Sequence, residues 1–188
     1  AFEGGHILAG MRAAPGAIER FWLIEGEPHF QTVEGAPPIG LCGSGILDVV
    51  AELLQGGVLS RQGRLNQGHP LVKLSGKVAE FPLVETGLAP DARPIVFTQR
   101  DVREVQLATA AIRTGVALLL RDAGLEPMDL QSVLLAGAFG NYFDPRNAMA
   151  VGLLPRLPLD RIRQIGNAAG MGARMALLSM KHRKEAEQ

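Results

Sequence analysis

Three short glycine-rich segments, at residues 40–45, 137–141 and 166–172, are the part of this sequence best suited to binding chemistry. Glycine lets backbone amides approach an anion closely, and a helix amino terminus adds about half a positive charge. Contact with phosphate or adenosine would suit such segments. A structural use of glycine, in tight turns and close helix packing, is favoured for any single loop, but three loops in one chain weaken that interpretation.

Known phosphate-binding motifs do not explain these loops. No lysine follows Gly43-Ser44-Gly45, as a Walker A motif requires, and no loop has the G-x-G-x-x-G order. Each loop alone is therefore weak evidence for a nucleotide site.

The elements that must position the loops can be predicted from local patterns. Residues 19–24 and 29–33 are β-prone runs separated by a turn of hairpin length, so they predict an antiparallel pair. Loop 40–45 leads into an apolar stripe at helical spacing, from Ile46 to Leu54. A glycine loop thus opens a helix there.

The middle of the chain predicts one long helix. Residues 60–76 are polar and rich in glycine, so we expect irregular structure, and residues 78–84 predict an edge strand. Thr98 is a plausible cap for a long amphipathic helix that Gly124 ends.

Strand-to-helix units follow in the last third. Residues 132–135 form a short buried-strand pattern that runs directly into loop 137–141, and Asp144-Pro145 predicts the start of another helix. A last strand at 161–165 leads into loop 166–172 and a closing helix. This order predicts an α/β fold with a mixed sheet flanked by helices.

Composition narrows the function classes. The chain has 188 residues, 47% hydrophobic and 20% charged, which fits one globular domain. Nineteen basic residues balance nineteen acidic ones, which disfavours nucleic acid as a partner. No apolar run reaches the roughly 18 residues that a membrane span needs. One cysteine, Cys42, excludes an internal disulfide or a multi-thiolate metal site, and the four histidines lack ligand spacing, so we expect a cytoplasmic protein and no metal site in this chain.

A more specific signal comes from six short sequence motifs, which are distributed in a fixed order over nearly the whole chain. They are Ala1-Phe2-Glu3-Gly4, Gly10-Met11-Arg12, Gly40-Leu41-Cys42-Gly43-Ser44-Gly45, Thr98-Gln99-Arg100-Asp101-Val102, Leu135-Ala136-Gly137-Ala138-Phe139-Gly140-Asn141-Tyr142 and Gly166-Asn167-Ala168-Ala169. Together they resemble the reductive activators of corrinoid proteins.

That resemblance implies an actin-like ATPase fold of the ASKHA superfamily (acetate and sugar kinases, heat-shock chaperones and actin), which is ribonuclease H-like. It implies a parent protein that uses ATP with magnesium to return cobalt(II) corrinoid proteins to cobalt(I). It also implies an amino-terminal ferredoxin-like domain with a 2Fe-2S cluster. Because the sequence starts abruptly at Ala1, we expect residues 1–188 to be the carboxy-terminal nucleotide-binding subdomain of that longer iron–sulfur protein.

The same resemblance implies a nucleotide site built by the three loops. Ala138 stands where the family's adenosine motif has a second glycine. Its methyl group therefore leaves less space for the nucleotide to approach the backbone. No D-x-G-T-like string for the phosphates is present, so no catalytic residue is assigned and the chain alone is expected to be inactive. The implied nucleotide-binding residues are Gly43, Ser44, Gly45, Gly137, Ala138, Phe139, Gly140, Asn141, Gly166 and Asn167.

Partners and alternatives follow from the same comparison. The implied partner is the corrinoid protein of a methyltransferase system, and a homodimer is a further option. Two other functions stay open: a lobe of an ASKHA-fold small-molecule kinase, or a non-catalytic docking or dimerisation module. A kinase would need a catalytic base and a substrate pocket, for which the sequence offers no candidate constellation.

Several residues also have structural interpretations. Cys42 is expected to be a small buried hydrophobe, and Asp101, Asp144 and Asn167 are expected at helix starts. Glu3 and Arg12, in the matched opening strings, could face a cleft or form a salt bridge. Phe21 and Trp22 are adjacent on a strand and therefore lie on opposite faces.

Overall fold

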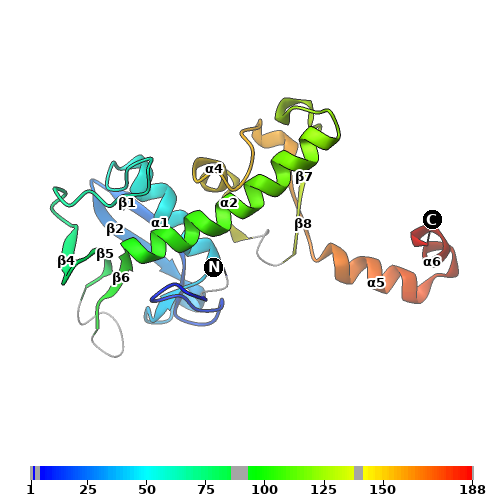
Figure 1. Ribbon diagram of the computed structural model, residues 1–188. Helices are drawn as coiled ribbons and strands as arrows, with labels where there is room; N and C mark the ends of the chain where they lie inside the picture. The colour runs from blue at the N-terminus through cyan, green and yellow to red at the C-terminus, as the bar shows by residue number, and fades with distance from the viewer. Residues whose placement is uncertain (1, 3–4, 86–92, 138–141, 188) are drawn as a thin grey trace.

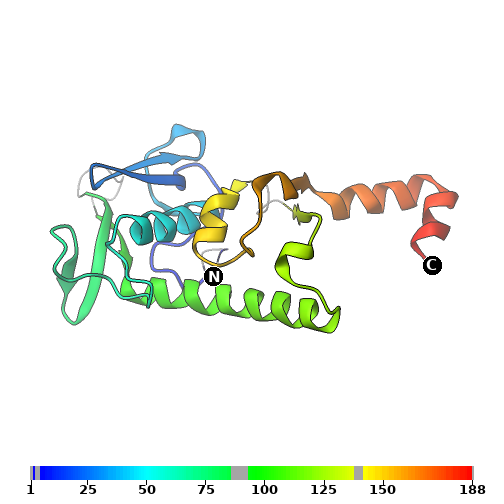
Figure 2. The same ribbon diagram turned by 90° about the horizontal axis from the view of Figure 1, so that it is seen from above.

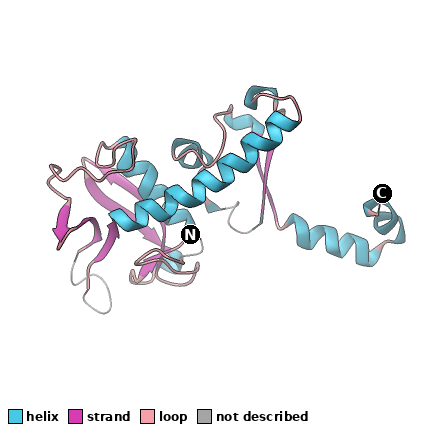
Figure 3. Cartoon of the chain, viewed as in Figure 1, coloured by secondary structure: helices cyan, strands magenta, loops and turns pink. Residues whose placement is uncertain are grey.

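The computed structural model describes residues 2, 5–85, 93–137 and 142–187. Figures 1 and 3 show that the chain contains both strands and helices throughout its length. The strands and helices are β1 (Ala17–Ile24), β2 (Glu27–Thr32), β3 (Gly40–Leu41), α1 (Gly43–Gln55), β4 (Lys73–Ser75), β5 (Val78–Val84), β6 (Ile95–Thr98), α2 (Gln99–Asp122), β7 (Val133–Ala136), α4 (Pro145–Ala150), β8 (Ile162–Gly166), α5 (Ala168–Leu178) and α6 (Met180–Ala186). Single 3-10 turns lie at Val33–Gly35, Pro127–Asp129 and Leu159–Arg161.

The first sheet confirms the predicted hairpin. Strands β1 and β2 pair in antiparallel register, with Phe21 opposite Phe30, and β3 joins the other edge of β1 in parallel. Side chains alternate along β1, so Phe21 is buried while Trp22 is 38% exposed and stacks on His29. The expected placement of the two aromatic residues on opposite faces is confirmed.

The second sheet corrects one prediction. Its order is β4-β5-β6, so residues 78–84 form the central strand and not an edge strand. Pro82 lacks a backbone donor, which usually confines proline to edges. Here the register shifts between Pro82 and Val84, and this irregularity accommodates the missing hydrogen bond. The segment 60–76 also contributes β4, where only irregular structure was expected.

Helix α1 lies at the centre of the main core. Its apolar residues Ile46, Val49 and Leu53 are fully buried and pack with the first two sheets. Burial of each such side chain contributes about 1.5–3 kcal/mol relative to exposure. This packing holds the amino-terminal end of α1, and therefore loop 40–45, against β1.

Helix α2 is a long helix that extends away from the second sheet (Figures 1 and 2). The Thr98 hydroxyl accepts from the Asp101 amide, and the Asp101 carboxylate accepts from the Thr98 amide at 2.8 Å. This capping box confirms the predicted helix start. The buried residues of α2 all lie in its first half, at Asp101, Val102, Val105 and Thr109.

The third sheet is the parallel pair β7–β8. The predicted mixed sheet is therefore distributed over three small sheets with helices beside them. Helices α5 and α6 extend away from the rest of the chain in both views (Figures 1 and 2). Their apolar residues are strongly exposed, including Leu177 at 75% and Leu178 at 74%.

Candidate functional site

Gly137 lies at the carboxyl end of β7 in a conformation that favours glycine. Its φ is +90°, in the left-handed region, and a Cβ added there would have no atom of the described residues within 4 Å. Among the described residues, none blocks the close approach of another group to the Gly137 backbone. This geometry fits the contact that the resemblance implies for an adenosine.

Strand pairing brings Gly137, the first residue of the second glycine loop, close to the start of the third loop. Because β7 and β8 are parallel, their carboxyl ends lie at the same edge, where Ala136 pairs with Gly166. In open α/β sheets, ligands bind beyond the carboxyl ends of the strands. Gly137 and Asn167 each follow directly after one of these paired residues, so the sheet places them beside each other.

Asn167 has a structural task in addition to its place at this edge. Its side-chain oxygen accepts from the Gly170 amide at 2.9 Å and caps α5, as the sequence predicted. A Cβ on Gly170 would lie within 3 Å of the Asn167 side chain. Glycine at 170 thus makes room for the cap, while the exposed Asn167 stays at the sheet edge.

Loop 40–45 is buried and packs against β1. A Cβ on Gly45 would fall on the carbonyl oxygen of Ile18, so this glycine permits close approach of α1 to β1. The Cys42 thiol donates to the Ile18 carbonyl at 3.4 Å and lies 3.5 Å from the Ser44 hydroxyl. Gly43, Ser44 and Gly45 therefore face the protein interior, and Cys42 is the small buried residue that was expected.

Helix α1 connects this buried loop to the segment that follows β7. Leu47 of α1 packs with Phe143, Ala148 and Leu153 in a second small core. Asp144 caps α4 by accepting from the Arg146 amide at 2.8 Å, as predicted. The helix that loop 40–45 begins therefore packs on α4.

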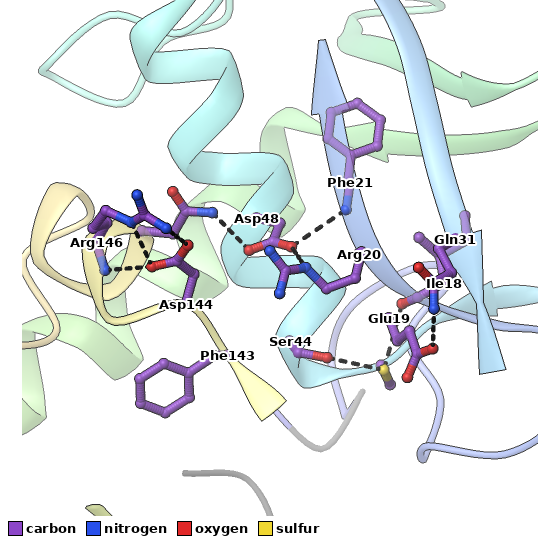
Figure 4. A network of polar contacts seen from close by, with 12 residues as sticks. Ile18, Glu19, Arg20, Phe21, Gln31, Ser44, Asp48, Phe143, Asp144 and Arg146 are labelled. Atoms are coloured by element: carbon purple, nitrogen blue, oxygen red, sulfur yellow. Dashed lines mark hydrogen bonds and ion pairs between the residues drawn. The ribbon is translucent and has the colours of Figure 1, made fainter. Parts of the chain in front are cut away.

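A buried carboxylate, Asp48, lies in the same contact (Figure 4). It accepts from the Asn147 side-chain amide at 2.7 Å and from the Phe21 backbone amide at 3.3 Å, and it pairs with Arg20 at 3.0 Å. Burial is the main cause that raises the pKa of Asp48 above its ordinary value. Sequence reasoning missed both Asp48 and Asn147. An acid inside the apolar stripe of α1 was the signal that could have found Asp48.

The remaining predicted residues can be placed only in part. Ala138, Phe139, Gly140, Asn141 and Glu3 lie outside the described residues. Arg12 is exposed, and no ion pair joins it to another residue of the described ranges. Asp101 has the structural role of capping α2 and also accepts from the Leu8 amide at 2.8 Å.

A large groove lies away from these residues, along α2. It has a volume of about 940 Å³ and is lined by α2, by residues 59–61 and by the segment 149–156. None of the predicted site residues within the described ranges lines it. The described part of the chain also contains no cluster of three or more metal-ligating side chains, and none of its helices is long and apolar enough to cross a membrane.

The strands, the helices beside them and the parallel β7–β8 pair are consistent with an ASKHA-type domain, and comparison with known proteins shows that class. The family described as the C-terminal domain of RACo, the ASKHA domain, matches residues 1–188. This chain belongs to that family.

Known relatives are consistent with the family. The chain is 40% identical to the corrinoid activation enzyme RamQ of Eubacterium limosum, covering 95% of this chain and 32% of that protein. It is 27% identical to the [Co(II) methylated amine-specific corrinoid protein] reductase of Methanosarcina barkeri, covering 95% and 33%. A solved structure of a reductive activator for a corrinoid, iron-sulfur protein matches with a TM-score of 0.89 and 36% identity, covering 99% of this chain and 30% of that one. The chain thus spans about a third of these relatives.

Proposed function

We propose that this chain is the carboxy-terminal ATP-binding lobe of an ATP-dependent reductive activator that returns cobalt(II) corrinoid proteins to cobalt(I). The observation that carries the proposal is the family match over residues 1–188. Relatives named for corrinoid activation and for reduction of a Co(II) corrinoid protein support it. Because the chain spans about a third of these relatives, we place the 2Fe-2S cluster in an amino-terminal domain of a longer protein.

The proposed place for the adenosine is the carboxyl edge of β7 and β8. No atom of the described residues would meet a Cβ at Gly137, and Gly166 and Asn167 lie at the neighbouring strand end. In this arrangement the chain's own residues bind and orient the nucleotide, while ATP supplies the free energy for an uphill reduction. Magnesium is usually held by the phosphates and one or two carboxylates. We place those carboxylates outside this chain, together with the phosphate-binding hairpins.

The lobe itself should carry no electron. Its one thiol, Cys42, is buried and bonded to the Ile18 carbonyl, and a single thiol cannot hold a cluster. Instead, the lobe would change shape when it binds nucleotide. It would also dock the corrinoid protein of a methyltransferase system. Such a link requires ATP and the partner to be thermodynamically coupled, ordinarily by about 1–3 kcal/mol.

The test uses the full-length protein with a cobalt(II) corrinoid protein and a low-potential one-electron reductant. Visible absorbance reports cobalt(I) as one electron is added to each cobalt(II). We expect cobalt(I) to form with ATP, and not with ADP or without nucleotide. In parallel, calorimetry measures the affinity of the full-length protein for ATP. Equal reduction with and without ATP would refute the proposal, as would the absence of ATP binding.

A further inference from the structure

The groove along α2 carries a positive charge that none of the described residues lining it balances. Among these residues, Arg61, Arg113 and Arg156 are cationic and none is Asp or Glu. The chain as a whole balances nineteen basic residues with nineteen acidic ones, so the groove is a local concentration of positive charge. Within the described ranges, none of the three arginines forms an ion pair.

These arginines come from three different parts of the chain. Arg113 lies in the second half of α2, and a Cβ added to Gly152 would be 3.4 Å from a terminal nitrogen of its guanidinium. Arg113 therefore reaches the wall that residues 149–156 form, and Arg156 belongs to that wall. Arg61 lies in the loop that lines the groove before β4. The positive charge is thus distributed around the groove and is not confined to one helix.

A buried hydroxyl in the groove lacks a hydrogen-bond partner. Thr109 lines the groove with only 8% of its surface exposed, and its Oγ1 bonds to none of the described residues. A buried hydroxyl without a partner is unfavourable, and most such groups in native structures bond to protein, water or a ligand. Val102 and Val105 of the same helix also line the groove and are buried. The groove therefore offers apolar contact and an unused hydroxyl in addition to its cations.

The length of the groove suits a chain segment better than a compact small molecule. Its lining residues on α2 run from Val102 to Leu120, which corresponds to about 27 Å at the rise of an α-helix. An extended peptide needs roughly eight residues to span that length. Guanidinium groups bind carboxylates strongly, because two parallel hydrogen bonds can join the pair. Length and charge together fit an acidic peptide segment that also presents apolar side chains.

We propose that the groove along α2 is the docking site for an acidic segment of the corrinoid protein. Carboxylates of that segment pair with Arg113 and Arg156, and one of its polar groups bonds to the Thr109 hydroxyl. This inference rests on the proposed function, which names a corrinoid protein as the partner. None of the described residues assigned to the nucleotide lines the groove, so the partner and ATP occupy different surfaces and can be bound together.

The experiment compares variants of the full-length protein. Calorimetry measures the affinity of each variant for a cobalt(II) corrinoid protein and, separately, for ATP, and thermal unfolding measures stability. Arg113→Glu and Arg156→Glu reverse a charge in the groove, and Thr109→Val removes the hydroxyl while keeping the shape. Arg103→Glu is the matched control, because Arg103 is an exposed arginine of the same helix that does not line the groove.

We expect Arg113→Glu and Arg156→Glu each to weaken binding of the corrinoid protein by about tenfold or more, because the new carboxylate repels the acidic segment. Thr109→Val should weaken this binding about fivefold. It should not lower the melting temperature, since the hydroxyl has no partner among the described residues. All three variants should bind ATP as the wild type does, and Arg103→Glu should match the wild type in both affinities.

Several results would overturn the docking site while the proposed function stands. If the wild type reduces the corrinoid with ATP and both groove reversals bind the corrinoid protein normally, docking occurs elsewhere. If these reversals only lower the melting temperature, another part of the longer protein fills the groove. An equal loss of partner affinity in Arg103→Glu would show a general effect of charge.

Two further outcomes complete the test. If Arg113→Glu fails to fold, Arg113→Gln takes its place, because it removes the charge without reversing it, and unchanged affinity for the corrinoid protein would again refute the docking site. If the wild type neither binds nor reduces the corrinoid protein, the proposed function itself fails, and the docking site fails with it.

Discussion

Alanine at position 45 tests whether loop 40–45 is built for packing or left free for a ligand. A Cβ on Gly45 would fall on the carbonyl oxygen of Ile18, a residue with no exposed surface. Neither atom belongs to a flexible side chain, so α1 would have to move away from β1 by about 1 Å to restore ordinary contact. Overpacking of this kind typically costs 1–3 kcal/mol, occasionally more.

The cost should lie at the upper end of that range. Ile46, Val49 and Leu53 are fully buried on α1, and all of them would move with the helix. We expect Gly45→Ala to destabilise the protein by about 3 kcal/mol. For a domain of this size, that corresponds to a fall in melting temperature of roughly 6–12 °C.

Thermal unfolding of the full-length protein, followed by calorimetry, measures this effect. Gly115→Ala is the matched control, because Gly115 lies within α2 and a Cβ there would meet nothing within 4 Å. That substitution should stabilise the protein by about 0.5–1 kcal/mol, since glycine is unfavourable inside a helix. If Gly45→Ala is as stable as the wild type, α1 is not packed on β1 as described, and the structural explanation of this glycine is wrong.

Three further predictions concern the nucleotide edge, the thiol and the buried acid. Gly137→Val should lower ATP affinity at least tenfold, about 1.4 kcal/mol. Gly124→Val is the control, because Gly124 also has a positive φ and no described atom near its Cβ position, and it should leave ATP affinity unchanged. Equal ATP binding by both variants would remove Gly137 from the site. Cys42→Ser should leave the rate of cobalt reduction within about twofold of wild type, because a lone buried thiol carries no cluster. If the variant folds but cannot reduce the corrinoid, the thiol has a chemical role. Burial raises the pKa of Asp48 above 3.8, so its contribution to stability is complete below that pH and is lost as pH rises through the folded pKa. Urea titrations should therefore show wild type losing stability relative to Asp48→Asn across that window, with Arg20, Asp144 and Asn147 unchanged in both; a difference independent of pH would contradict this.

Local rules in the sequence were sufficient for most of the described elements. Thr98 and Asp101 are three residues apart, so their capping box depends only on the helix they begin. The hairpin of β1 and β2 follows from a short turn between two β-prone runs, and Asn167 caps α5 through a residue three positions away. The place of Gly137 directly after β7 was predictable for the same reason.

Tertiary structure decided which glycines and acids matter and how. Gly45 is constrained by Ile18, and Asp48 is bonded to Asn147, so each role depends on an element distant in sequence. Pro82 favoured an edge position for β5, yet pairing with β4 and β6 placed it centrally. Composition and periodicity report which side of an element is buried, but not which element covers it. That choice is made by packing between distant segments, because only the folded chain brings their atoms within contact distance.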